Sequence, residues 1–174
     1  MTEAHEAWLR EICDAMCDYE AGNSLRIHHF LKVHAFARQI GLHEGLSGEE
    51  QFTLEAAALT HDIGIKPAIE QTGACPGPLQ ERLGPPVAEP MLRSLGLPEE
   101  VISRVCFLIG HHHTTVGVEG IDWRILLEAD YLVNMIENGH SMQQIDAYRT
   151  NVFRTREGLR LLERVIPAEI RKGS

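Results

Sequence analysis

The fold is decided between residues 54 and 64, where the chain reads Leu54-Glu55-Ala56-Ala57-Ala58-Leu59-Thr60-His61-Asp62-Ile63-Gly64. The inward face of this predicted helix carries Leu54, Ala58 and His61 at i, i+4, i+7 spacing, so the imidazole of His61 points into the core. Asp62 follows about 100° further round the helix axis. Their side chains can converge on one cation just beyond the helix end. The alternative is a plain helix terminus with the imidazole near the negative end of the dipole.

A second inward histidine is predicted on the helix that precedes this stretch. The helix is expected to begin at Ser24 as its cap and to run to Gly41. His29 lies on its apolar stripe, and His28 lies on another face. The stripe consists of Leu25, His29, Val33, Phe36 and Ile40. His29 is therefore expected to point into the core, and His28 into solvent.

A buried carboxylate is predicted further along the chain. Asp130 lies within the apolar run from Leu126 to Val133. Burying a carboxylate without a partner is very costly, so Asp130 needs a cation. A buried salt bridge to Arg26 or Arg124 is one solution. A metal ion shared with the two inward histidines is the other, and it alone also explains the histidines.

Two imidazoles and two carboxylates form a mixed nitrogen and oxygen donor set. Its members are His29, His61, Asp62 and Asp130. Such a set suits a divalent ion of Mn, Fe, Co, Ni, Mg or Zn rather than copper electron transfer, and it leaves positions for water and substrate. A centre of this kind can activate water and polarise a phosphoryl oxygen. The donor set alone does not identify which of these metals binds.

Helix signals dominate the remaining sequence, and no convincing run alternates between apolar and polar residues. The chain is therefore predicted to be all-α, an irregular single-domain helical bundle over residues 1–174, with the metal-site core at 24–135 and C-terminal helices at 141–170. Helix N-caps are predicted at Thr2, Ser24, Ser47, Asp122, Ser141 and Thr155. Residues 62–86, rich in Gly and Pro, predict a long loop with about one helical turn, and helices are expected again at 87–95, 99–112 and 123–137.

The charge and composition exclude several functions. A formal net charge of −9 argues against a nucleic-acid surface or an anionic-membrane surface, because both need a basic footprint. No apolar run approaches the roughly 20 residues that span a bilayer. The first residues lack the basic and apolar regions of a secretory signal, and the four cysteines are scattered, so a cytoplasmic protein with reduced thiols is expected.

The order His29, His61-Asp62, Asp130 resembles the HD-domain metal-dependent phosphohydrolases. The flanking segments Arg26–Val33 and Leu59–Gly64 carry the same likeness, which covers roughly residues 24–135. The resemblance implies that these four side chains hold a divalent metal. It also implies hydrolysis of a small phosphate ester such as a nucleotide, by a phosphomonoesterase or phosphodiesterase. The expected partner is therefore a small-molecule phosphate ester, and a homodimer stays open.

Two departures from the family's pattern narrow this expectation. Members with two metals have a further histidine a few residues before the position of Gly84, whereas residues 79–83 here contain none. One metal per chain is therefore expected. Some nucleotidase members carry an acidic residue three positions after the His-Asp pair, where this chain has Ile65. This departure argues against a close match to those nucleotidases.

Three side chains are candidates for catalysis. Asp62 could orient the attacking water or take its proton. His112 continues the buried stripe of its predicted helix, and the family often has a histidine pair there, so it is the candidate donor to substrate phosphate, with His111 second. Lys66 could contact phosphate as a point charge. The alternatives are a polar helix end for residues 111–113 and a solvated loop lysine.

Two other functions fit the same predicted fold. One is a catalytically silent module that senses a nucleotide or a metal. The other is a di-iron oxygenase on the same frame, which the missing histidine before Gly84 disfavours. Turnover of phosphate esters would separate the hydrolase from the sensor, and iron content with oxygen consumption would indicate the oxygenase.

Overall fold

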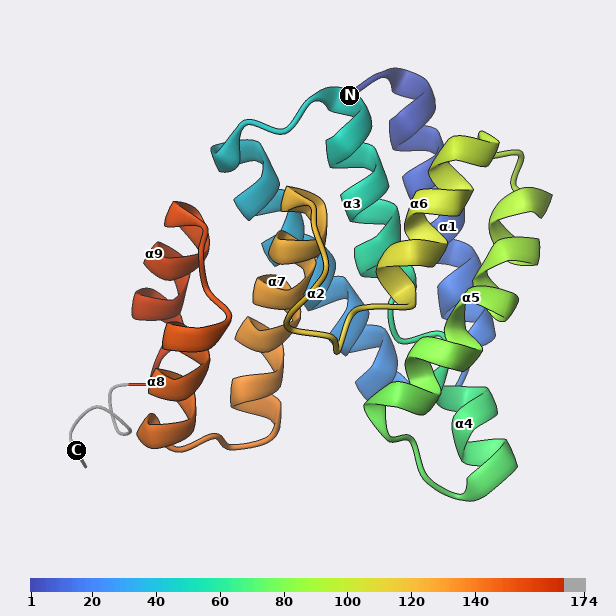
Figure 1. Ribbon diagram of the computed structural model, residues 1–174. Helices are drawn as coiled ribbons and strands as arrows, with labels where there is room; N and C mark the ends of the chain where they lie inside the picture. Colours follow the sequence, from blue (N-terminus) through green and yellow to red (C-terminus); the bar gives the residue numbers. More distant parts are fainter. Residues whose placement is uncertain (168–174) are drawn as a thin grey trace.

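A computed structural model describes residues 1–167 and shows nine helices, with no strand in this part of the chain (Figure 1). The predicted all-α fold is confirmed. Residues 168–170, predicted to end the last helix, lie outside the described residues. The helices are α1 (Glu3–Tyr19), α2 (Ser24–Glu44), α3 (Gly48–Thr60), α4 (Ile65–Thr72), α5 (Gly77–Ser94), α6 (Glu99–Ile109), α7 (Ile121–Glu137), α8 (Met142–Asn151) and α9 (Arg156–Val165).

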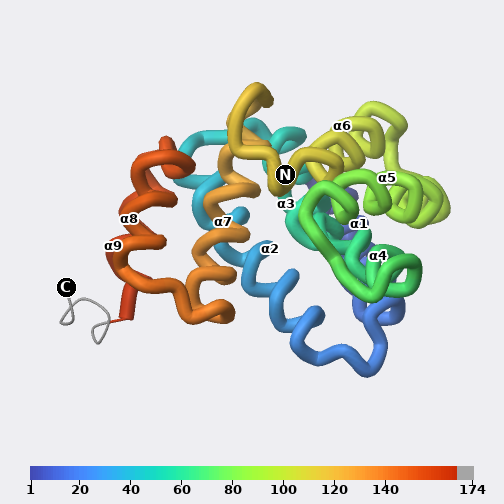
Figure 2. The backbone as a smooth tube through the Cα atoms, turned by 60° about the horizontal axis from the view of Figure 1, so that its bottom comes forward, coloured from blue at the N-terminus to red at the C-terminus, as the bar shows by residue number. Residues whose placement is uncertain are grey.

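Helix α3 lies at the centre of the bundle and packs against α1, α2, α6 and α7. Every residue from Gln51 to Thr60 is buried, as expected for a helix surrounded by others. The chain therefore leaves α3 inside the molecule, at His61 and Asp62. Figures 1 and 2 show α4 and α5 on one side of this centre and α8 and α9 on the other.

Most predicted helix caps are confirmed, and α2 is corrected. Side chains cap α1 at Thr2, α3 at Ser47, α8 at Ser141 and α9 at Thr155. Asn23, not Ser24, caps α2, and this helix continues past Gly41 to Glu44. Gly41 stays helical because α3 packs against it, and a Cβ there would lie 2.3 Å from Gln51 Oε1. Leu25, predicted on the inward stripe, is 79% exposed, because it lies in the first turn of α2, at the mouth of a cavity.

The predicted long loop at residues 62–86 is wrong. This segment forms α4 and the first part of α5, and two of its prolines, Pro85 and Pro86, lie inside α5. Two glycines allow the close packing that stabilises these helices. A Cβ at Gly64 would lie 2.4 Å from the Gln80 carbonyl oxygen, and one at Gly84 would lie 2.5 Å from Ile109 Cγ2. Tertiary packing thus overrides the low helix propensity of Gly and Pro.

Two further helix ends differ from the prediction. Helix α6 ends at Ile109 with Gly110 as its C-cap, so His112 follows the helix. Helix α7 begins at Ile121 with Gly120 at the N-cap, and Asp122 lies in its first turn. Asp122 does not cap the helix, because Arg104 binds its carboxylate in an ion pair at 2.7 Å. In the described part of the chain, no helix is both long enough and apolar enough to span a membrane.

A buried carboxylate joins the last two helices to the core. Glu128 on α7 accepts hydrogen bonds from the backbone N–H groups of Arg154 (2.6 Å) and Thr155 (3.0 Å), and the Thr155 hydroxyl also donates to it. These residues connect α8 to α9. The segment that follows α8 is therefore fixed against α7.

Candidate metal centre

Four side chains from two helices and one helix end converge in the core. They form the His/Asp cluster: His29 of α2, His61 and Asp62 just after α3, and Asp130 of α7. The Nε2 atoms of His29 and His61 lie 3.3 Å apart, and Asp130 Oδ1 lies 3.2 and 3.5 Å from them. Asp62 Oδ2 lies 3.4 Å from His29 Nε2 and 3.7 Å from His61 Nε2. The ligand atoms of His29, His61 and Asp130 all lie within 4.8 Å of one another and could hold one cation, and Asp62 Oδ2 lies beside both imidazoles.

The two imidazoles are oriented for ligation by hydrogen bonds on their outer sides. His29 Nδ1 lies 2.8 Å from Glu137 Oε2, and His61 Nδ1 lies 2.9 Å from the Ala58 carbonyl oxygen. An acceptor at each Nδ1 places the proton of the neutral ring there and leaves a lone pair on Nε2. Two lone pairs facing one another at 3.3 Å need a cation between them. The residues present thus fit a divalent metal.

The charges of the cluster also call for a cation. Burial alone would lower the pKa of His29, but the hydrogen bond to Asp130 and the charges of Asp62 and Asp130 raise it to about 9. Burial alone would raise the pKa of Asp130, but hydrogen bonds to His29 and His61 lower it well below its usual range. Without a metal, protonated imidazoles supply the positive charge that pairs with the carboxylates. A divalent ion would supply the same positive charge.

Neither predicted salt-bridge partner reaches Asp130. Arg26 Nη1 lies 3.3 Å from Asp62 Oδ2, and Arg124 donates to the Val152 carbonyl oxygen at 2.8 Å. Asp130 Oδ1 instead accepts from Asn134 Nδ2 at 2.8 Å, and its cationic neighbours are the two histidines. The salt-bridge alternative for Asp130 is therefore wrong.

His112 is the member of the histidine run that reaches the cluster. It is 1% exposed, and its Nδ1 lies 2.6 Å from the Ile109 carbonyl oxygen. Its Nε2 has no hydrogen-bond partner among the described residues and lies 3.5 Å from Asp62 Oδ1. His111 stacks on Phe107 instead, with ring centroids 4.3 Å apart.

A second group of possible ligands adjoins the first. It consists of Asp62, His112 and His113, whose ligand atoms lie within 4.8 Å of one another. The two oxygens of Asp62 face different groups, Oδ2 toward the imidazoles of His29 and His61 and Oδ1 toward His112. The missing histidine before Gly84 thus does not remove every possible ligand for a second ion.

Lys66 lies away from the cluster. Its Nζ donates to the Tyr19 carbonyl oxygen at 3.0 Å and lies 4.7 Å from the centroid of the Tyr19 ring. It lines a separate cavity, of about 320 Å³, that shares Arg26 with the cluster's surroundings. The structure does not bring Lys66 to the His/Asp cluster. The sequence could not predict the direction of this side chain, because a segment expected to be a loop has no helical periodicity.

Two cavities border the cluster. The arginine cavity has a volume of about 340 Å³, and its lining includes Arg26, His29, Asp62, Asn134, Glu137 and Asn138. The tyrosine cavity has a volume of about 260 Å³, and its lining includes His112, Asp130, Asn134, Asn138, His140 and Tyr148. Sequence reasoning missed Asn134 and Glu137. Both lie on the face of Asp130, four and seven residues further along α7, and this spacing could have revealed them.

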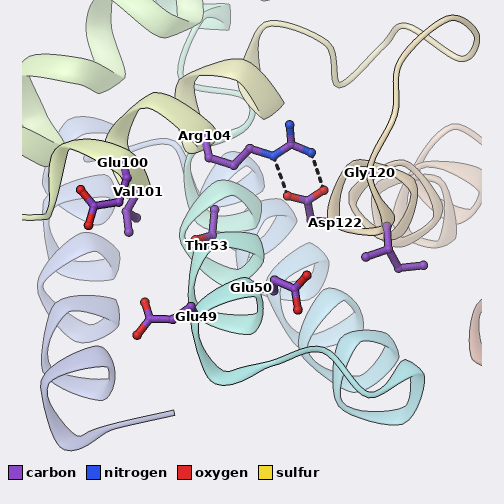
Figure 3. A pocket seen from close by; sticks show the side chains of 9 residues that line it. Glu49, Glu50, Thr53, Glu100, Val101, Arg104, Gly120 and Asp122 are labelled. Atoms are coloured by element: carbon purple, nitrogen blue, oxygen red, sulfur yellow. Dashed lines mark hydrogen bonds and ion pairs between the residues drawn. The ribbon is translucent and has the colours of Figure 1, made fainter.

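A larger cavity of about 500 Å³ lies where α3, α6 and the start of α7 meet (Figure 3). Its described lining residues include no histidine. Four acidic side chains line it, Glu49, Glu50, Glu100 and Asp122, and Asp122 is paired with the cavity's arginine, Arg104. None of the candidate residues lies there, so size alone does not mark the functional site.

Comparison with known proteins agrees with this geometry. A family model of the HD domain matches residues 26–150. Among solved structures, the chain is similar to a predicted HD superfamily hydrolase from an uncultured Thermotogales bacterium, at a TM-score of 0.63 and 22% identity over 89% of this chain and 83% of that one. This likeness shows the shared fold. No curated protein matches significantly. Because the matched residues are well over half of the chain, the protein belongs to the HD-domain family.

Proposed function

We propose that the protein hydrolyses a small phosphate ester, with a nucleotide as the expected class, at a divalent metal held by the His/Asp cluster. One observation carries the proposal. The Nε2 atoms of His29 and His61 lie within 3.2 to 3.7 Å of the carboxylates of Asp62 and Asp130, beside two cavities. A buried set of two imidazoles and two carboxylates has the chemistry of a hydrolytic metal site.

The surrounding side chains supply what phosphoryl transfer needs. A bound divalent ion would lower the pKa of a coordinated water below that of bulk water and would polarise a phosphoryl oxygen. Arg26 lines the arginine cavity, and its planar guanidinium can bind phosphate oxygens in addition to Asp62. Charge stabilisation and positioning account for most of catalysis in such reactions.

Proton transfer falls to Asp62 and His112. Asp62 Oδ1 is placed to accept a proton from the attacking water. In its imidazolium form, with Nδ1–H held by the Ile109 carbonyl oxygen at 2.6 Å, His112 would donate a proton from its buried Nε2 to an ester oxygen. Lys66 has no part in this mechanism, because its amine binds Tyr19.

The first test measures metal content and turnover together. Protein purified without chelator is analysed for metals by mass spectrometry and assayed on a panel of phosphate esters with Mn, Co, Ni or Mg. His61→Ala and Asp62→Ala are expected to lose the metal and at least about 1000-fold of the turnover, the scale of a lost catalytic group, with helicity retained. His28→Ala is the matched control, since its exposed side chain neighbours His29.

The possible outcomes separate the alternatives. Full metal content and activity in His61→Ala or Asp62→Ala would disprove the assignment. A metal-loaded protein that binds nucleotides without turnover would be a sensor, and iron with oxygen consumption would indicate an oxygenase. One ion per chain is expected. Two ions, one of them lost in His112→Ala, would assign Asp62, His112 and His113 as a second site.

A further inference from the structure

The two cavities beside the cluster differ in their cationic groups. Arg26 lines the arginine cavity together with the carboxylates of Asp62 and Glu137, whereas no lysine or arginine is among the described residues that line the tyrosine cavity. Asp130, the carboxylate of the tyrosine cavity, therefore has no guanidinium beside it that could pair with an anion. Phosphate groups bind where guanidinium or ammonium groups can pair with them. A phosphate therefore fits the arginine side of the cluster, and an uncharged group fits the tyrosine cavity.

The wall of the tyrosine cavity suits a ring. Tyr131 of α7 and Tyr148 of α8 stack with centroids 3.8 Å apart and planes 13° from parallel. The Tyr131 hydroxyl lies 3.2 Å from His140 Nδ1, which fixes the phenol on the core side of this pair. The wall is thus formed before any ligand binds, and a flat or apolar face can pack against it with little loss of side-chain entropy.

Polar groups face this aromatic wall. His112 Nε2 is buried and has no hydrogen-bond partner among the described residues. Asn138 lies one turn beyond Asn134 and lines both cavities. Asn134 is already held by Asp130 at 2.8 Å, whereas Asn138 is exposed and makes one longer hydrogen bond, of 3.4 Å, to Asn134. Asn138 therefore keeps donors and an acceptor for hydroxyl or carbonyl groups of a ligand.

The volume limits the size of the bound group. The tyrosine cavity holds about 260 Å³. Cavities for drug-sized ligands start at about 300 Å³, so this one takes a single ring or a small pair of rings. An added diphosphate would exceed the space and would find no cation there.

We infer that the tyrosine cavity binds the uncharged ring of a phosphate monoester while the phosphate lies at the cluster beside Arg26. The inference rests on the proposed function and narrows its substrate to the monophosphate of a sugar or a nucleoside. Both sources present the same chemistry, a polyhydroxylated ring on one phosphate. In hydrolysis the water oxygen bonds to phosphorus as the ester P–O bond breaks. The ring then leaves as its alcohol, with a proton from water.

The kinetic test compares ring substrates with a minimal one. Tyr148→Ala and Asn138→Ala are assayed with Mn²⁺ on ribose 5-phosphate, uridine 5′-monophosphate and acetyl phosphate. The KM for the preferred ring substrate is expected to rise about tenfold, the value of one lost aromatic or hydrogen-bond contact, with kcat within about twofold. Acetyl phosphate kinetics stay unchanged in Tyr148→Ala, because Tyr148 lines the tyrosine cavity alone. Which ring compound responds distinguishes a free sugar from a nucleoside.

Four further variants test the specificity of this result. Gln143→Ala on α8 and Ile136→Ala on α7 change exposed side chains outside both cavities and are expected to have no effect. Tyr148→Phe keeps the aromatic wall and should restore the KM. Thr115→Lys places a cation at the tyrosine cavity and should raise the kcat/KM of uridine 5′-diphosphate relative to the monophosphate.

A binding measurement separates this inference from the proposed function. Saturation-transfer NMR is recorded for uridine and for ribose with the chelator-treated full chain. Contact in the wild type that Tyr148→Ala abolishes supports the cavity assignment, even if no phosphate ester is turned over. Turnover with unchanged KM in both cavity variants, or equal kcat/KM for uridine mono- and triphosphate, would overturn it and leave the hydrolase proposal standing.

Discussion

Glu137 acts on the cluster through a single hydrogen bond. Its Oε2 lies 2.8 Å from His29 Nδ1, and its Oε1 pairs with Lys32 one turn further along α2 from His29. Burial would raise the pKa of Glu137, but the hydrogen bonds from Lys32 and His29 outweigh it, so the pKa is lowered and the carboxylate stays ionised. A charged acceptor at Nδ1 fixes the ring and makes Nε2 a better ligand.

Glu137→Ala is therefore expected to weaken metal affinity by about 10- to 100-fold, the usual effect of removing such a partner. Glu137→Gln keeps a hydrogen-bond acceptor without the charge, so its metal affinity should lie between those of the wild type and Glu137→Ala. Competition against a fluorescent chelator measures the affinity, with exposed Glu119→Gln as control. Equal affinities for all four proteins would show that Glu137 does not position His29.

For single residues, the sequence predicted well which side chains point into the core and predicted poorly which side chains contact one another. The spacing of apolar residues correctly predicted that His29, His61 and Asp130 point toward the core, because helical periodicity indicates which face of a helix is buried. Arg26 was considered only as a partner for Asp130, and the structure pairs it with Asp62. Contacts between helices depend on how they pack, and spacing along one helix does not contain that information.

Helices α4 and α5 show where local propensity misleads. Gly and Pro disfavour helices, so the segment after Asp62 was predicted as a loop. The structure uses its glycines for close contact between helices, with Gly64 against Gln80 and Gly84. Pro86 and Pro90 face solvent on α5, where their rings do not disturb the core. Helix caps, which depend on a few neighbouring residues, were predicted far better.

Gly64→Ala should consequently destabilise the protein by about 1–3 kcal/mol, the cost of overpacking. The new Cβ would lie 2.4 Å from a backbone oxygen, which cannot move as a side chain can. Gly110→Ala is the matched control, because its Cβ would have no neighbour nearer than 3.4 Å. Urea denaturation of both variants measures the difference. Equal unfolding free energies would show that α5 does not pack tightly on Gly64.

Across the whole molecule, a second buried carboxylate joins the first three helices. Glu55 of α3 is fully buried and lies 2.9 Å from both His34 Nε2 and Arg38 Nη1 of α2. Arg38 also reaches Glu6 of α1 at 3.5 Å. Burial alone would raise the pKa of Glu55, but hydrogen bonds from His34, Gln51 and Arg38 lower it. Its ionised form is therefore stabilised in the folded state.

This shift predicts how stability depends on pH. Because the folded-state pKa of Glu55 is below its ordinary value of 4.5, its contribution is complete above about pH 5 and is lost as the pH falls through the folded-state value. Glu55→Gln should destabilise the protein by about 1–3 kcal/mol at pH 7. The difference in unfolding free energy between Glu55→Gln and the wild type should decrease in acid. Urea denaturation at pH 7 and pH 4 tests this, with exposed Glu11→Gln as control. A gap that does not change with pH would contradict it.

The attachment of α8 has a consequence for how this protein could diversify. The presumed metal ligands come from α2, α3 and α7, whereas Tyr148 and Val152, at the tyrosine cavity, come from α8 and its end. The chain after α8 is joined to the core through the carboxylate of Glu128. Under the proposed assignment, mutations in α8 can therefore alter which compound binds without changing the ligands of the metal. Chemistry and selectivity can evolve separately within one small chain.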